Sequence, residues 1–469
     1  MEEKFYKRGL ILIFGLGILL RVVLFLVNPS LFADESALAI NIYNKSFKEL
    51  FGALDFLQAS PVGFTIIVKS LITIFNPQSD YLRDLVLRIF PFISGMLSLP
   101  AFYYLVKLIF KENKKAILTS LFFLFFNPCA IAYCAQIKQY STEMLISIIL
   151  LIFFYKTVFL KDYKWWYSIV FAVCVWFSYS SFFILASGFL FMLIYDRRNF
   201  IKAVFPTIIS CIIYYFISLK IVFAEVFYPM RAVWEVNFGF LDIHHPLRML
   251  LRYGDMFANA KVVSAISGMV FFAVWIMYCL SKENDNKKYL FALPLLLTVI
   301  ASIMHKYAIQ ARLILFVLPL FAIMLAEIKG RFANVLKTII AVIMMISLFN
   351  YDVEPSGNCY SYAREIVKYL DENIQPDDKI LMDTTVNDYN LYLKNRNFEN
   401  EIVYLPVACF KKDLKECRDF IRELPAGQYY LLSLSYYVKE LTNDFDTKEL
   451  NVGFKPKRTK AIYFEKGDK

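Results

Sequence analysis

Two adjacent carboxylates, Asp34 and Glu35, stand shortly after the first apolar run of the chain, residues 9–27. Carboxylates at the mouth of a membrane-spanning helix are costly unless they face water, a cation or a substrate. A carboxylate can take the proton from an incoming hydroxyl group, and carboxylates can also hold a divalent metal. A topology set by charge places this pair on the outer face of the membrane. The position therefore indicates chemistry outside the cytoplasm on a membrane-borne substrate.

The same two residues also have a simpler interpretation. Residues 36–40 look helical, so Asp34 and Glu35 would form the N-cap and the first turn of a short helix, where negative charge is favourable. A capping role and a catalytic role can coexist in one residue pair.

Basic residues are expected on the same outer face. Arg88 lies just inside an apolar run, where a charge needs a partner. Lys306 and Arg312 stand at the outer end of a later apolar run. They could bind a phosphate together as a clasp, or they could be ordinary snorkelling side chains. Carboxylates with a surplus of cations suit a phosphorylated donor that also needs a nucleophile, such as a sugar linked to a polyprenyl phosphate.

A third group of polar residues stands at the outer end of two apolar runs. Lys138 and Tyr140 are candidates for substrate binding, and interface anchoring is the alternative. Tyr140 and Glu143 are three residues apart and share a helix face. His244 and His245 could bind metal, but adjacent side chains point apart.

Composition requires a membrane class of protein. Apolar residues make up 59% of the 469 residues and charged residues only 19%, against about half and a quarter in soluble domains. The net charge of +11 comes mostly from short loops between apolar runs, which indicates positive-inside anchoring rather than binding of nucleic acid.

Spans need about 20 apolar residues, and about eleven runs meet this criterion. We expect the N-terminus to be cytoplasmic and the run 9–27 to be a span rather than a cleavable signal peptide. We expect residues 61–75 to form an interfacial or re-entrant helix within an outer loop, 28–84. The expected spans are residues 9–27, 85–109, 116–133, 142–160, 165–181, 182–195, 203–220, 262–280, 289–304, 313–328 and 332–349.

The chain after residue 350 is different in kind. Helical periodicity over 360–373, a turn at 376–378 and apolar strands at 379–382 and 427–432 predict a small α/β domain. We therefore predict a transmembrane domain, 1–350, and a soluble extracytoplasmic accessory domain, 351–469. Three of the eight cysteines, Cys359, Cys409 and Cys417, fall in this tail, so a disulfide there stays open.

Several motifs resemble those of a known family, the membrane-embedded GT-C glycosyltransferases. The relatives are bacterial homologues of the dolichyl-phosphate-mannose protein mannosyltransferases (glycosyltransferase family 39-like) and the lipid A aminoarabinose transferase. The matching features, over residues 10–320, are the acidic pair Asp34-Glu35, the Pro61 segment 58–64, the Arg88-x-x-Pro91-x-x-x-Gly95 helix start, the Lys138-x-Tyr140 motif and the Arg312 to Pro319 helix.

This resemblance implies an all-α polytopic membrane bundle of GT-C type in a prokaryotic cytoplasmic (inner) membrane. It implies inverting transfer of a sugar from a polyprenyl-phosphate donor to a protein, lipid or polysaccharide acceptor on the outer face. Asp34 would be the base, with Glu35 positioning the acceptor or supporting the loop. Arg88, Lys138, Tyr140, Lys306 and Arg312 would bind substrate.

No cofactor is required, although a divalent metal (Mg, Mn or Zn) could join the reaction. Relatives often carry Glu two residues before the basic residue of the Tyr motif, where this chain has Gln136. The metal ligands would then be Asp34 and Glu143. Two alternatives remain. One is a lipid-linked oligosaccharide flippase or transporter, and the other is a polysaccharide polymerase or ligase, an option that the basic loop 221–261 leaves open.

Overall fold

In a computed structural model, the chain folds into two compact units. Unit 1 contains residues 1–27, 45–75 and 85–357, and unit 2 contains residues 28–44, 76–84 and 358–469. The structure describes residues 2–230, 248–258, 260–281, 287–349, 361–382, 387–394, 396, 398–406, 414–434, 441, 444–445, 447–450 and 459–466. The predicted domain boundary at residue 350 falls outside these ranges.

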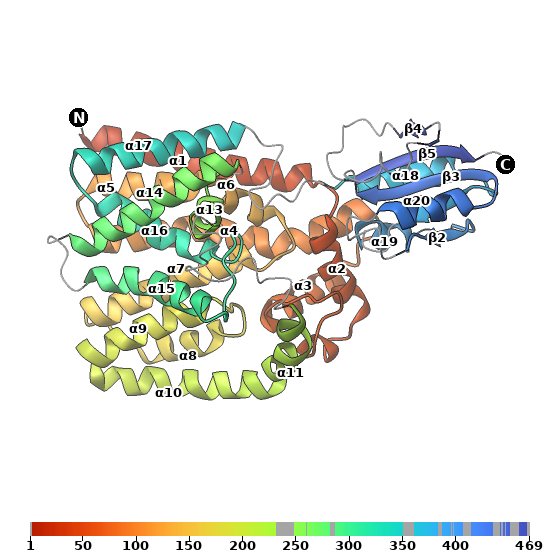
Figure 1. The fold of residues 1–469 in the computed structure, drawn as a ribbon. Helices are drawn as coiled ribbons and strands as arrows, with labels where there is room; N and C mark the ends of the chain where they lie inside the picture. Colours follow the sequence, from red (N-terminus) through yellow and green to blue (C-terminus); the bar gives the residue numbers. More distant parts are fainter. Residues whose placement is uncertain are drawn as a thin grey trace. The chain divides into compact units, whose positions relative to one another are not determined.

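The regular secondary structure of unit 1 is helical in its described residues, and loops and turns connect the helices (Figure 1). Its helices are α1 (Glu2–Val27), η1 (Glu49–Phe51), α3 (Val62–Phe75), α4 (Asp80–Phe110, from Leu85), α5 (Lys114–Phe125), α6 (Pro128–Ala132), η2 (Tyr133–Ala135), α7 (Tyr140–Phe159), α8 (Trp165–Cys174), α9 (Ser181–Tyr195), α10 (Arg197–Tyr214), η3 (Tyr215–Leu219), α11 (Lys220–Val222), η4 (Phe223–Phe227), α13 (Arg248–Gly254), α14 (Lys261–Leu280), α15 (Lys287–Ile303), η6 (Leu315–Val317), α16 (Leu318–Glu327) and α17 (Arg331–Phe349).

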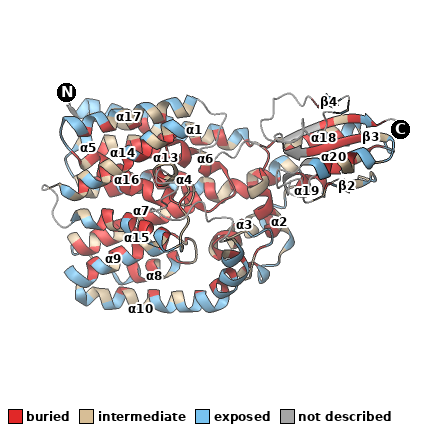
Figure 2. Ribbon diagram, viewed as in Figure 1, coloured by how far each residue is buried: buried red, intermediate tan, exposed pale blue. Residues whose placement is uncertain are grey.

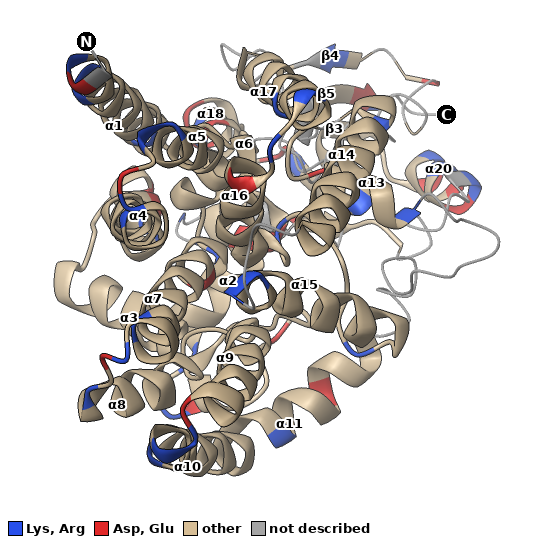
Figure 3. Cartoon of the chain, turned by 90° about the vertical axis from the view of Figure 1, so that its left-hand side faces the viewer, with Lys and Arg blue, Asp and Glu red and all other residues tan. Residues whose placement is uncertain are grey.

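The length and composition of these helices make the chain a multi-pass membrane protein. Six helices within the described residues can cross a membrane: α1, α4, α7, α10 with its continuation to Met230, α14 and α17. Figure 3 shows Lys and Arg gathered at helix ends and in connecting loops, with long uncharged stretches between them. Each of the eleven expected segments contains a helix, but the count of eleven spans stays a prediction.

The predicted continuous span 116–133 is broken in the structure. Helix α5 and the segment from Pro128 to Ala135 meet at an angle of 58°. Pro128 cannot continue a helix from the preceding turn but fits a first turn, and the Asn127 side chain caps α6 by accepting from Ala130 N at 3.0 Å. The break comes from this Asn-Pro pair, and counting the bent pair as one span raises the number of spans to seven.

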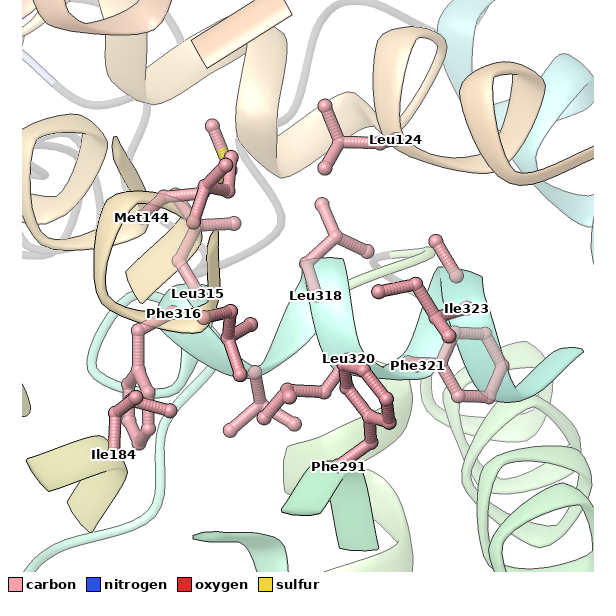
Figure 4. Packing of buried hydrophobic residues seen from close by; sticks show 14 of the residues in the cluster. Leu124, Met144, Ile184, Phe291, Leu315, Phe316, Leu318, Leu320, Phe321 and Ile323 are labelled. Atoms are coloured by element: carbon pink, nitrogen blue, oxygen red, sulfur yellow. The ribbon is translucent and has the colours of Figure 1, made fainter. Parts of the chain in front are cut away.

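The core of unit 1 lies around α7 and α16. Every residue of α16 from Leu318 to Ala326 is buried (Figure 2). Figure 4 shows side chains of α16 and of the preceding turn, η6, packed among Leu124 of α5, Met144 of α7, Ile184 of α9 and Phe291 of α15. A helix that is apolar on all sides must be surrounded by other helices, which makes α16 and α7 the scaffold of this unit.

Unit 2 is built on a five-stranded sheet with the strand order β2-β1-β3-β5-β4. Strands β1, β2 and β3 pair in parallel, and β5 pairs antiparallel with β3 and β4. Its elements are α2 (Ala33–Asn44), the first turn of α4, α18 (Ala363–Asn373), β1 (Lys379–Met382), α19 (Asn387–Leu393), β2 (Ile402–Tyr404), α20 (Leu414–Glu423), β3 (Gly427–Leu434), β4 (Thr447–Glu449) and β5 (Thr459–Lys466).

Helices cover both faces of this sheet. Ile380 and Met382 of β1 pack in one cluster with residues of α18 and α19, whereas Leu381 packs in another cluster with Cys417 and Ile421 of α20. This alternation follows the two-residue period of a strand. The predicted α/β character of the tail, with a helix over 360–373 and strands at 379–382 and 427–432, is confirmed.

Candidate active site

The candidate residues are divided between the two units. Asp34 and Glu35 belong to unit 2, and the predicted substrate-binding residues and Glu143 belong to unit 1. The predicted His244-His245 pair lies outside the described residues.

Lys138 is the best positioned of the predicted cations. It lies in the short connection between η2 and α7, it is 3% exposed, and its Nζ donates to Oε1 of Gln58 at 2.7 Å. A lysine is almost never buried in this way unless it is paired. The segments 58–64 and 138–141, which the sequence analysis singled out separately, therefore meet in the fold.

Glycine explains how this connection is held in place. A Cβ at Gly95 would lie 2.5 Å from the Cβ of Cys134, so only glycine lets α4 approach η2 so closely. One turn further along α7, Thr142 Oγ1 donates to Ser94 Oγ at 2.9 Å. The Arg88-x-x-Pro91-x-x-x-Gly95 motif thus supports the segment that carries Lys138.

Three buried polar atoms in the segments 58–64 and 138–141 make no hydrogen bond within the part of the chain that the structure describes. They are Oγ of Ser60, Oε1 of Gln139 and Oγ of Ser141. Most buried polar groups in proteins are hydrogen-bonded, and an exception needs an explanation such as a ligand or water. Next to a buried lysine, these atoms are suited to a polar substrate group.

Glu143 has a structural partner. The carboxylate is buried in the first turn of α7, and its Oε1 accepts from the backbone N–H of Tyr179 at 3.1 Å. The Tyr179 hydroxyl donates to the carbonyl of Ser60 at 2.9 Å. Glu143 therefore helps tie the turn between α8 and α9 to the segment beside Lys138.

A second close approach fixes that same segment. Gly63 N–H donates to the Trp176 carbonyl at 2.8 Å, and a Cβ on Gly63 would lie 2.8 Å from that oxygen. Tyr214 in α10 accepts from Val62 N–H at 3.4 Å. The Pro61 segment is thus held by the Trp176 carbonyl, just after α8, and by the Tyr214 hydroxyl of α10. A side chain at position 63 would disturb the contact with Trp176.

The other predicted binding residues differ in exposure. Arg88 is buried within α4, and Tyr140 is buried with its ring edge-on to Tyr133 at a centroid distance of 5.1 Å. Arg312 is half-buried and its Nε donates to Gln310 Oε1 at 3.0 Å, whereas Lys306 is exposed. Lys306 and Arg312 are therefore unequal members of the predicted clasp.

In unit 2, the acidic pair stands at the start of α2. Glu35 is buried and its Oε2 accepts from Phe32 N–H at 3.4 Å, while Asp34 is partly exposed. A carboxylate that reaches back to the residue before the helix forms half of a capping box. The capping alternative thus applies to Glu35, and Asp34 is the more accessible carboxylate.

Metal binding by Asp34 and Glu143 stays a prediction. Among the described residues, no group of three or more His, Cys, Asp or Glu side chains is placed to hold a metal ion. The two predicted ligands belong to different units.

Arg21 was not among the residues predicted from the sequence. It is completely buried within α1, and its Nη1 donates to the carbonyls of Gly17 and Phe125, each at 2.9 Å. Phe125 is the last residue of α5, where carbonyl groups lack helical partners and attract a cation. A charge inside the run 9–27 was the available signal, because an ionisable residue within a span is expected to have a specific partner.

Sequence comparison finds no matching family model and no matching curated protein. Among solved structures, the chain is similar to ArnT from Cupriavidus metallidurans bound to undecaprenyl phosphate, with a TM-score of 0.51 and 11% identity over 96% of this chain and 97% of that chain. An oligosaccharyltransferase from Archaeoglobus fulgidus, tethered to an acceptor peptide, is also similar, with a TM-score of 0.46 and 12% identity over 93% and 72% of the two chains. A second structure of that archaeal protein, in complex with Zn and sulfate, has a TM-score of 0.45 and 12% identity over 91% and 69%.

The likeness to ArnT extends over nearly the whole of both chains. At 11% identity it establishes the fold alone, and the protein has a GT-C-like fold. The resemblance drawn from short motifs is confirmed at this level.

Proposed function

We propose that this protein transfers a sugar from a polyprenyl-phosphate donor to an acceptor on the outer face of a prokaryotic cytoplasmic membrane. The observation that carries the proposal is the GT-C-like fold, shared over 96% of the chain with an ArnT structure that contains undecaprenyl phosphate. The buried Lys138, with polar atoms beside it that make no hydrogen bond among the described residues, supports a site for a charged substrate group.

The proposed reaction is a single displacement with inversion. The acceptor hydroxyl attacks the anomeric carbon, the new carbon–oxygen bond forms, and the bond from that carbon to the phosphate oxygen breaks. Asp34 takes the proton of the acceptor hydroxyl, since it is the more exposed carboxylate of the pair. Glu35 supports α2 through its capping contact.

The leaving polyprenyl phosphate gains negative charge at the bridging oxygen. Lys138 and Arg88 are the buried cations of unit 1 proposed to stabilise it, with Tyr140, Arg312 and Lys306 completing donor binding. Salt screens a buried cation poorly, so Lys138 and Arg88 should contribute most.

The orientation in the membrane is also a proposal. Lys and Arg in the loops favour a cytoplasmic N-terminus and an outer C-terminal part. Cys417 in α20 is disulfide-bonded. Within the described residues, no disulfide is formed by the cysteines of unit 1, which are Cys129, Cys134, Cys174, Cys211 and Cys279. Disulfides persist in oxidising compartments, which supports an extracytoplasmic location for unit 2.

The decisive experiment compares wild type with Asp34→Asn and Asp55→Asn in nanodiscs. Asp55 is an exposed carboxylate of the same outer stretch and pairs with Lys45 at 3.1 Å, so it is a matched control. Radiolabelled polyprenyl-phosphate sugars are supplied as donors, with and without added Mg, Mn or Zn, and release of free polyprenyl phosphate is followed.

With water in the place of the acceptor hydroxyl, we expect slow release of free polyprenyl phosphate by wild type and Asp55→Asn. Asp34→Asn should lose at least about 100-fold, because general-base catalysis contributes about that much. Full activity of Asp34→Asn would remove Asp34 from the mechanism. Donor binding without turnover, combined with movement of the lipid-linked sugar between leaflets, would favour a flippase instead.

A further inference from the structure

Unit 2 joins three stretches of the chain that are far apart in sequence. Residues 28–44 contain the acidic pair, residues 76–84 contain the first turn of α4, and the remainder is the C-terminal α/β part. A small number of polar residues connects the three stretches, and nearly all of them are buried or half-buried.

Asp84 is the centre of these contacts. Its side chain is 0% exposed, and its Oδ2 accepts from the Tyr392 hydroxyl at 2.7 Å and from Nη1 of Arg364 at 2.9 Å. Arg83 Nη2 lies 3.3 Å from the other oxygen of Asp84. A fully buried carboxylate requires such partners, and two of them come from the C-terminal part.

The same two residues hold the segment that precedes the acidic pair. The Tyr392 hydroxyl accepts from Leu31 N–H at 2.9 Å, and Arg364 Nη2 donates to the Asn28 carbonyl at 2.9 Å. Ser30 completes this contact by donating to Glu365 and accepting from Arg364 N–H. The chain is therefore fixed three residues before Asp34.

The far end of α2 is also connected to the C-terminal part. Lys394, which follows α19, donates to Asn44 Oδ1 at 3.1 Å. Helix α2 also packs on α19 along its length. Burial, together with the charge of Asp84, raises the pKa of Tyr392 well above its usual range, so this phenol keeps its proton and donates it. The hydroxyl thus links Asp84 to Leu31 as donor and acceptor at once.

We propose that Tyr392 and Arg364 are positioning residues, through which the C-terminal α/β part sets the position of α2 and of the Asp34 carboxylate. This inference rests on the proposed function, because it assigns the consequence of the contact to catalysis. Reactive groups must be held within about 0.5 Å, and a displacement of about 1 Å can cost about 100-fold in rate. The C-terminal part is then a component of the catalytic centre.

The test is Tyr392→Phe, with Tyr429→Phe as the matched control. Tyr429 is equally buried in the C-terminal sheet, and its hydroxyl donates to the Pro425 carbonyl at 2.8 Å, away from residues 28–44 in sequence and in hydrogen bonding. Two readouts are combined: amide hydrogen exchange of peptides covering residues 28–44, which needs no substrate, and kcat and KM for the polyprenyl-phosphate donor.

We expect exchange in residues 28–44 to accelerate at least about tenfold in Tyr392→Phe, because Leu31 N–H and Asp84 lose a buried partner. The value of kcat should fall about 10- to 100-fold while the donor KM stays within about threefold, because the proposed donor cations belong to unit 1. Tyr429→Phe should match wild type in both readouts.

Each other outcome identifies which idea fails. Unchanged exchange in Tyr392→Phe would overturn the positioning contact, and faster exchange with wild-type kcat would overturn its importance for catalysis. Absence of wild-type turnover with every donor would overturn the proposed function, while the exchange data would still decide the contact. If Tyr392→Phe does not fold, Arg364→Lys tests the same idea, since lysine keeps the charge beside Asp84 but cannot also reach Asn28.

Discussion

Lys138→Met is the prediction that follows most directly from the geometry of unit 1. The substitution keeps the length of the side chain and removes its charge. Lys138 is 3% exposed and Lys306 is exposed, although the sequence makes both of them candidates for the donor phosphate. Methionine in a buried site introduces no unpaired charge, so the variant should fold.

The size of the effect depends on this difference in burial. Two unit charges about 4 Å apart attract by about 4 kcal/mol at an effective dielectric constant of 20, but only by about 1 kcal/mol in bulk water. Desolvation reduces the first figure, and hydrogen bonds to charged groups contribute about 1.5–3 kcal/mol net. Removing Lys138 should therefore raise the donor Kd roughly 10- to 100-fold, and removing Lys306 by less than about fivefold.

The assay is binding of a polyprenyl phosphate to purified protein in nanodiscs, at about 0.05 M and about 0.5 M salt. Salt should weaken the contribution of Lys306 more than that of Lys138, since buried pairs are screened less. A Lys138→Met protein that binds donor as well as wild type would refute the assignment. Equal losses in Lys138→Met and Lys306→Met would refute the argument from burial.

Two predictions concern stability. A Cβ on Gly268 would lie 1.9 Å from the Leu250 carbonyl oxygen, so Gly268→Ala should force α13 away from α14. The thermal unfolding temperature should fall, at a cost of about 1–3 kcal/mol or more. Gly15→Ala is the control and should not lower it, because a Cβ on Gly15 would meet nothing within 4 Å. Burial raises the pKa of Asp255 to about 6 despite Arg252 nearby. The folded state then binds more protons than the unfolded state between about pH 4 and pH 6, and wild type loses stability as pH rises through that range. Relative to wild type, Asp255→Asn should therefore become more stable between pH 4.5 and pH 7.5, by at most about 3 kcal/mol in the free energy of unfolding. The measurement is the unfolding temperature of both proteins at the two pH values. A difference between the proteins that does not change with pH would contradict the assignment.

Helices and strands could be predicted from the sequence because they depend on local patterns. Apolar runs located helices throughout unit 1, and short apolar stretches located β1 and β3. The break at Pro128 was missed because hydropathy averages over a window in which one Asn-Pro pair has little weight. The fold changes direction there through backbone geometry and not through polarity.

The candidate site could be predicted in part. Charges beside apolar runs pointed to Lys138 and to the acidic pair, since polar groups in such places need a reason. Exposure could not be predicted, and it separates Lys138 from Lys306 and Asp34 from Glu35. Arg21 was missed because its partner, the Phe125 carbonyl, exists only once α5 ends beside α1.

Residues 28–84 were predicted to form one outer loop of the membrane domain, whereas the structure groups 28–44 and 76–84 with the C-terminal part. Pairing between segments 280 or more positions apart leaves no periodic signal in a single sequence. Buried contacts such as those of Asp84 with Arg364 and Tyr392 reveal it.

The buried ion pair of Asp84 and Arg364 favours a positioning role over a purely stabilising one. Replacing a buried ion pair with apolar residues is often neutral or stabilising, so Asp84 and Arg364 are a poor choice if stability alone is required. Hydrogen bonds differ from apolar contacts in fixing direction as well as distance. Tyr392 and Arg364 each bind both Asp84 and the backbone before α2, which defines one position for that helix. Apolar packing at this place could keep unit 2 folded while leaving the carboxylate of Asp34 free to shift by the distance that catalysis does not tolerate.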